Sequence, residues 1–157
     1  MFKNNKLILN SILIFSILSL SIAYFVQYVL GHEPCNLCLI ERIPYIAAII
    51  LISLIFIIRK YEKLIIIIIS IFFIIGAVIS FYHVGIEQNF FEENLLCNLG
   101  SPGENISRDQ LLEQLKNTPV SCKDVTFRFL GLSLATINTV ISLVLSAIMI
   151  KILKNYG

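Results

Sequence analysis

Residues 64–82 read LIIIIISIFFIIGAVISFY, an almost unbroken apolar run without a charged side chain. A helix needs about 20 mostly apolar residues to cross the hydrocarbon core of a bilayer, so this run is long enough to span. Three further stretches have the same character: residues 7–30, 43–58 and 129–150. Their apolar residues do not alternate with polar ones as in a membrane β-barrel, so the sequence predicts an all-α, four-helix transmembrane bundle.

The composition of the whole chain agrees with a single membrane domain over residues 1–157. Hydrophobic residues make up 57% of it, charged residues only 14%, and the mean hydropathy is +0.88. A net charge of +2 without a basic cluster or an aromatic platform argues against nucleic-acid binding. The first run, with Lys3 and Lys6 before it and the stretch SIAY at 21–24 as a candidate small-residue cleavage site, also resembles a signal peptide. We favour a retained span, because the apolar run continues to Leu30.

The positive charges predict the orientation of the helices. Lysine or arginine residues occur at the amino end, in RKYEK at 59–63, and at the carboxyl end, so both termini are expected in the cytoplasm. The segments 31–42 and 83–128 then face outward, the second as a long acidic loop. Every cysteine lies in these two segments: Cys35, Cys38, Cys97 and Cys122. Such a distribution is typical of a compartment where disulfides persist, such as the bacterial periplasm.

Cys35 and Cys38 form a Cys-x-x-Cys motif, which is a redox centre more often than a structural disulfide. The ring that such a pair closes is small, so loop entropy gives it little stabilising value. Pro34 suits the first turn of a helix, and the helix dipole would then favour a thiolate. Two inert structural disulfides in a small membrane scaffold are the alternative interpretation.

Arg42 follows the motif closely. A continuous helix would hold it on one face with Cys35 and Cys38, where its charge would stabilise a thiolate or a reduced acceptor. However, Pro44 removes a backbone donor, so the helix is expected either to kink or to begin only after Ile43. The alternative for Arg42 is an interfacial anchor that extends to the lipid headgroups.

Cys97 and Cys122 have a spacing that suits a disulfide across a long loop, although four cysteines allow three pairings. A zinc site is disfavoured, because only one pair has ligand-like spacing. Between the two, ISRDQLLEQLKN at 106–117 has the capping-box signature of a short surface helix.

His83 lies in SFYHVGIE, at the outward end of the third predicted helix and level with the Cys-x-x-Cys motif. A histidine there can hydrogen-bond a carbonyl or carry a proton. With Tyr82, it can equally belong to the belt of aromatic residues at the membrane surface. The residue alone does not decide between these interpretations.

Several separate stretches together resemble the bacterial disulfide bond formation protein B family, whose members are quinone-linked membrane thiol oxidases. The matching stretches are EPCNLCLIER at 33–42, YHVGIE at 82–87, SCKD at 121–124 and FLGLSLATIN at 129–138. The resemblance covers essentially the whole chain and includes the predicted layout with both ends inside. It implies a multi-pass protein of the bacterial inner membrane with its active cysteines on the periplasmic side.

The resemblance also implies a relay of electrons. Cys97 and Cys122 would accept electrons from a soluble periplasmic thiol oxidase that carries its own Cys-x-x-Cys motif. Cys35 and Cys38 would oxidise that pair and reduce ubiquinone or menaquinone from the membrane pool. By similarity, Arg42 would contact the quinone and His83 would lie beside it.

Two points limit the match. Many family members carry glutamine where this chain has Glu41, and the carboxylate would partly neutralise Arg42. The nearest rival enzyme class resembles vitamin K epoxide reductase, which also combines four core helices, a Cys-x-x-Cys motif and quinone chemistry. In that class the reactive pair lies at the last core helix, whereas here it precedes the second span.

Overall fold

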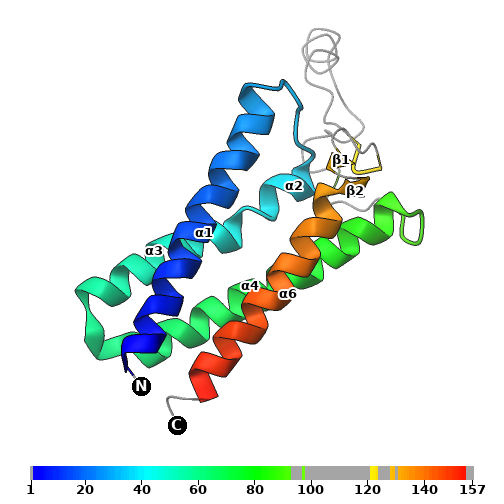
Figure 1. Cartoon of the computed structure of the whole chain (residues 1–157). Coiled ribbons are helices and arrows are strands. Elements are labelled where there is room, and N and C mark those ends of the chain that lie inside the picture. The colour runs from blue at the N-terminus through cyan, green and yellow to red at the C-terminus, as the bar shows by residue number, and fades with distance from the viewer. Residues whose placement is uncertain (1, 93–96, 98–120, 124–127, 130, 155–157) are drawn as a thin grey trace, which may run out of the picture.

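The chain folds into a bundle of four long helices (Figure 1). The computed structural model describes residues 2–92, 97, 121–123, 128–129 and 131–154. The long helices are α1 (Phe2–Tyr28), α3 (Ile43–Ile57), α4 (Glu62–Glu87) and α6 (Leu134–Lys154). All are long and apolar enough to cross a membrane when the short helix before α3 is counted with it, which confirms the predicted four-helix membrane bundle.

Helix α4 packs along α6, and α3 contacts both α1 and α4. Helix α1 begins and α6 ends at the same end of the bundle, where the 3-10 turn η1 (Arg59–Tyr61) also joins α3 to α4. Helix α4 buries several small residues, among them Ser70, Gly76, Ala77 and Ser80. Small residues are common where membrane helices pack closely. A β-carbon at Gly76 would lie 2.9 Å from the Pro44 ring, so α3 and α4 can approach closely only with glycine there.

The opposite end carries the shorter elements. Helix α2 (Asn36–Ile40) follows the link from α1 and ends before α3 begins. Strands β1 (Arg128–Phe129) and β2 (Leu132–Ser133) form an antiparallel hairpin, in which Gly131 has a φ of +84°. Helix α6 therefore begins after this hairpin, several residues later than the apolar run suggests.

Two hydrophobic cores fill the bundle. The larger core lies among the four long helices and includes Ile52, Ile69, Phe73 and Met149. The smaller core lies at the end that carries α2, and three of its buried members are cysteines: Cys35, Cys97 and Cys122. The predicted short helix at 106–117 falls outside the described residues.

Helix α4 runs on to Glu87, beyond the end of the apolar run at Tyr82. Its last turn is closed by Phe91, whose backbone N–H donates to the Gly85 carbonyl and whose ring stacks on Tyr82. A β-carbon at Gly85 would overlap the Phe91 ring. This packing places His83 inside the bundle, within a helix, and not in an exposed loop.

Candidate functional site

The Cys-x-x-Cys motif forms the start of α2. Cys35 is the N-cap residue, and its sulfur accepts a hydrogen bond from the Cys38 backbone N–H at 3.3 Å. The two sulfur atoms lie 2.8 Å apart, and neither is bonded to another cysteine. Cys35 is buried and Cys38 is half-buried. The helix start therefore holds both sulfurs close together, as reversible disulfide chemistry requires.

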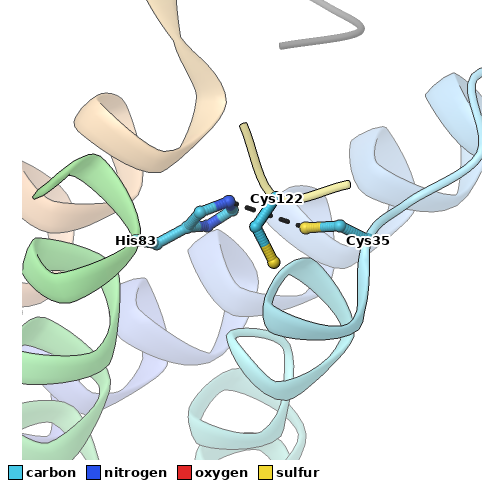
Figure 2. Close-up of side chains that lie close together, drawn as sticks. All are labelled: Cys35, His83 and Cys122. Carbon is cyan, nitrogen blue, oxygen red and sulfur yellow. Dashed lines mark hydrogen bonds between the residues drawn. The ribbon is translucent and has the colours of Figure 1, made fainter. Parts of the chain in front are cut away.

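His83, from α4, faces Cys35 across the site (Figure 2). Its Nε2 lies 3.5 Å from the Cys35 sulfur, and its Nδ1 lies 2.8 Å from Oε1 of Glu41. The histidine is 3% exposed and the glutamate 7%. Glu87 also approaches, with its carboxylate 3.9 Å from Nε2. A buried Cys35–His83–Glu41 chain results, with the histidine between a thiol and a carboxylate.

These contacts change the acidity of Cys35. The hydrogen bond from Cys38 lowers the pKa of the Cys35 thiol well below its ordinary value of 9.0. Burial acts in the opposite direction, and the contact with His83 lowers the pKa again. Cys35 is therefore the sulfur of the motif that favours the thiolate, the form that reacts in disulfide exchange.

The second cysteine pair docks directly on this site. Cys97 and Cys122 form a disulfide with their Cα atoms 6.0 Å apart, and both residues are buried. The Asn36 side chain donates to the Cys97 carbonyl at 2.9 Å. Figure 2 shows Cys122 beside Cys35 and His83, and the sulfur and nitrogen atoms of the three lie within 4.8 Å of one another. One sulfur of each pair therefore lies close to one sulfur of the other.

Glu41 has a second set of partners behind His83. Asn138 of α6 donates to Glu41 Oε2 at 2.9 Å and to the Ser80 hydroxyl at 2.6 Å. The Asn138 carbonyl oxygen accepts a hydrogen bond from the Tyr45 hydroxyl. Because both ends of the Asn138 amide are bonded, its orientation is fixed, and it fixes the carboxylate in turn.

Arg42 turns the other way, toward α1. Its guanidinium donates to the Gln27 side-chain oxygen at 2.6 Å and lies 4.9 Å from the centre of the Tyr24 ring. The helical structure is interrupted at residues 41 and 42, between α2 and α3, and Pro44 lies in the first turn of α3. The expected helix start near Ile43 is confirmed, and the continuous helix is wrong, because α2 ends at Ile40 before α3 begins. Arg42 nevertheless lines the same cavity as Cys38.

A cavity of about 260 Å³ lies between α1, the α2–α3 segment and α6. Its walls are mostly apolar. Its polar lining residues are Ser19, Gln27, His32, Glu33, Cys38, Glu41, Arg42, Tyr45 and Asn138. Such a site suits an apolar ligand with a polar head. Cys35 and His83 do not line it.

The structure thus brings Cys35, His83 and the loop pair together, and places Arg42 with Cys38 on the cavity. Sequence reasoning treated Glu41 only as a charge that would weaken Arg42, and it missed Asn138 and Gln27 altogether. All three are polar residues in or beside apolar spans. Such residues are functional candidates by default, and this signal could have found them.

Comparisons with known proteins identify the family of the chain. The model of the family "Disulfide bond formation protein DsbB" matches residues 5–152. An uncharacterized protein of Rickettsia prowazekii (strain Madrid E) is 29% identical over 147 residues, which are 91% of this chain and 85% of that protein. The search of solved structures gave no match. The chain belongs to the DsbB family of disulfide bond formation proteins and is a multi-pass membrane disulfide oxidoreductase.

Proposed function

We propose that the protein is a quinone-linked thiol oxidase of the bacterial inner membrane. It reoxidises a soluble periplasmic protein with a Cys-x-x-Cys motif, and so sustains disulfide formation in exported proteins. The observation that carries the proposal is the position of the two sulfurs of the motif. Cys35 faces Cys122 of the loop pair, whereas Cys38 lines the apolar cavity.

Disulfide exchange between the two cysteine pairs takes two steps. When the soluble partner has reduced the loop pair, the Cys122 thiolate attacks Cys35 of the Cys35–Cys38 disulfide, and Cys38 leaves as a thiolate. Cys97 then attacks Cys122, which restores the loop disulfide and releases Cys35 as a thiolate. A leaving thiol with a low pKa leaves faster, so the contacts that lower the pKa of Cys35 favour this second step.

The cavity fits the cofactor that this function requires. Its apolar walls suit a ring and an isoprenoid chain, and Arg42 offers a positive charge to a carbonyl oxygen. A ubiquinone or menaquinone bound there would supply the acceptor for two electrons. Gln27 and Tyr24 hold the guanidinium in place, and the sulfur of Cys38 lies on the same wall. His83, which contacts Cys35 and does not line the cavity, would act on the thiol side.

The assignment of sides rests on the positive charges. Lys60, Lys151 and Lys154 belong to the end of the bundle that lies away from the cysteines. Positive residues favour the cytoplasmic side, so the cysteine end would face the periplasm.

The test is quinone reduction by the purified protein in detergent, driven by a reduced soluble thiol oxidase and followed by the absorbance of the quinone. Wild type is compared with Cys38→Ser and Cys97→Ser. We expect turnover in wild type and its loss in both variants, while their melting temperatures stay close to wild type. A well-folded wild type that reduces neither ubiquinone nor menaquinone analogues would overturn the proposal and favour a scaffold with structural disulfides.

A further inference from the structure

The two sulfurs of the Cys-x-x-Cys motif differ in their access to the cavity. Cys38 lines it, whereas Cys35 is buried on the other side of α2, against His83 and the loop pair. Oxidation of a dithiol releases two electrons and two protons, and reduction of a quinone-class acceptor takes up both. The Cys38 proton is released beside the cavity. The second proton, which Cys35 gives to His83 when its thiolate forms, has to be carried there.

A chain of contacts leads from Cys35 to the cavity. The Cys35 sulfur lies 3.5 Å from His83 Nε2, and His83 Nδ1 lies 2.8 Å from Glu41 Oε1. Glu41 itself lines the cavity. Because the histidine is 3% exposed and the glutamate 7%, bulk water has little access to either. Each ring nitrogen thus has a different partner, which is the arrangement that lets an imidazole accept a proton at one side and donate one at the other.

The second carboxylate oxygen of Glu41 is also hydrogen-bonded. Asn138 donates to Glu41 Oε2, and Asn138 is itself fixed by Ser80 and Tyr45. Both Asn138 and Tyr45 line the cavity. The carboxylate therefore presents one oxygen to the histidine and the other toward cavity-lining groups.

We infer that Glu41 carries the Cys35 proton from His83 to the cavity. The inference rests on the proposed function and names a proton-carrying residue for it. The proton that leaves Cys35 as its thiolate forms is held at His83 Nε2, His83 gives its Nδ1 proton to Glu41 Oε1, and the carboxyl group releases a proton into the cavity. The electron pair left on Cys35 forms the bond to Cys38, and two electrons leave through the Cys38 sulfur to the quinone-class acceptor.

Two other carboxylates provide matched controls. Glu87 approaches His83 Nε2 at 3.9 Å but does not line the cavity. Glu92 is an exposed residue that does not line the cavity. Three described residues hydrogen-bond or ion-pair with His83: Cys35, Glu41 and Glu87. Of these, Glu41 alone also lines the cavity. The charged and titratable groups around Cys35 are accordingly Cys38, His83, Glu41 behind it, Glu87, and Cys122 when the loop pair is reduced.

The experiment uses the full chain in detergent with three variants: Glu41→Gln, Glu92→Gln and Glu87→Gln. The first readout is the pH profile of Cys35 alkylation by iodoacetamide in the reduced protein, resolved from Cys38 by mass spectrometry. The second is single-turnover reduction of a ubiquinone analogue by the reduced protein, recorded from pH 5.5 to pH 8.5. Glutamine keeps the shape of Glu41 and can still accept from Asn138, so a structural role is largely preserved.

We expect Glu41→Gln to move the alkylation midpoint of Cys35 upward and to slow quinone reduction by about 100-fold, as is typical when a general acid–base group is lost. Glu92→Gln should match wild type in both readouts. Glu87→Gln should alter the alkylation midpoint less than Glu41→Gln does, and leave the quinone step within about threefold of wild type. Should Glu41→Gln fail to accumulate, His83→Gln breaks the same path and is expected to slow the quinone step similarly.

Two results would overturn the inference while leaving the proposed function intact. One is a Glu41→Gln protein that reduces quinone at the wild-type rate and pH profile. The other is an equal loss in Glu41→Gln and Glu87→Gln, which would indicate a general effect of charge near His83. If wild type itself reduces no quinone, the proposed function fails and this inference with it. The alkylation profiles then report whether Glu41 acts on Cys35 at all.

Discussion

Replacement of Asn36 by alanine removes a side chain that ties the two cysteine pairs together. Asn36 lies between the cysteines of the Cys-x-x-Cys motif, and its amide donates to the Cys97 carbonyl at 2.9 Å. The loop disulfide is buried against the motif, with the Cys122 sulfur within 4.8 Å of the Cys35 sulfur. We therefore expect Asn36→Ala to weaken the docking of the loop pair while leaving both pairs chemically intact.

The size of the effect follows from the bond that is lost. A hydrogen bond of this kind contributes about 0.5–1.5 kcal/mol net. At 25 °C this changes the docking equilibrium constant by about 2-fold to 12-fold. Exchange between Cys35 and Cys122 requires the docked arrangement, because a thiolate must reach the disulfide sulfur in line. The exchange rate of Asn36→Ala should therefore be about 2-fold to 12-fold lower than that of the parent protein.

The assay uses a Cys38→Ser background, in which attack of Cys35 on Cys122 releases Cys97 as a free thiol. Rapid acid quench and alkylation then measure the rate at which Cys97 appears. Asn36→Asp is isosteric but has no N–H donor, so it should be at least as slow as Asn36→Ala. Leu39→Ala, at an exposed position of the same helix, should exchange at the parent rate. Parent-like rates in both Asn36 variants would refute the view that this contact docks the loop pair.

Three further predictions concern the thiol, the bundle and the cavity. The lowered pKa of Cys35 means that its thiolate persists as the pH falls, so iodoacetamide should modify it at pH 6 nearly as fast as at pH 8. The modification of an ordinary thiol slows about 100-fold between pH 8 and pH 6. Gly76→Ala places a methyl group against Pro44 and should reduce the free energy of unfolding by about 1–3 kcal/mol, measured as a lower melting temperature in detergent. Gln27→Leu removes a partner of Arg42 and should raise the KM for quinone about 2-fold to 10-fold with less effect on kcat.

Each of these has an opposing result. A Cys35 alkylation rate that falls tenfold per pH unit below pH 8 would show an ordinary thiol. Val78, on the same helix as Gly76, is 64% exposed, so Val78→Ala should leave the melting temperature unchanged. Equal melting temperatures for it and Gly76→Ala would contradict the close approach of α3 and α4. A Gln27→Leu protein with an unchanged KM would show that Arg42 does not need this contact.

The helices could be predicted from the sequence because a bilayer imposes one demand on every span. Runs such as residues 64–82 must satisfy their backbone hydrogen bonds internally, so apolar length alone indicates a helix. The ends of the helices depend instead on local packing. Helix α4 continues to Glu87 because Phe91 packs over Gly85, and α6 begins late because Gly131 turns a hairpin before it. Hydropathy carries neither signal.

The site was predictable where chemistry needs a particular residue type. The cysteines and their spacing identified the redox motif, and the level of His83 in its helix indicated that it lies near Cys35. The partners of Glu41 were not predictable, because Asn138 is 97 positions away in the sequence and meets it only through the packing of α6 against α4. The orientation of the Arg42 side chain was also not predictable, since it depends on the interruption between α2 and α3 at residues 41 and 42.

The burial of the sulfurs bears on selectivity among cellular thiols. Cys35, Cys97 and Cys122 are 5%, 3% and 2% exposed, packed together in the small core at one end of the bundle. Disulfide exchange requires the attacking sulfur to reach its target along the S–S axis, so glutathione, a bulky tripeptide, would approach these sulfurs more slowly than a small reagent such as iodoacetamide. A protein that displaces or reshapes this core would expose the loop disulfide to its own thiolate. The packing would thus act as a filter that favours protein thiols over free glutathione.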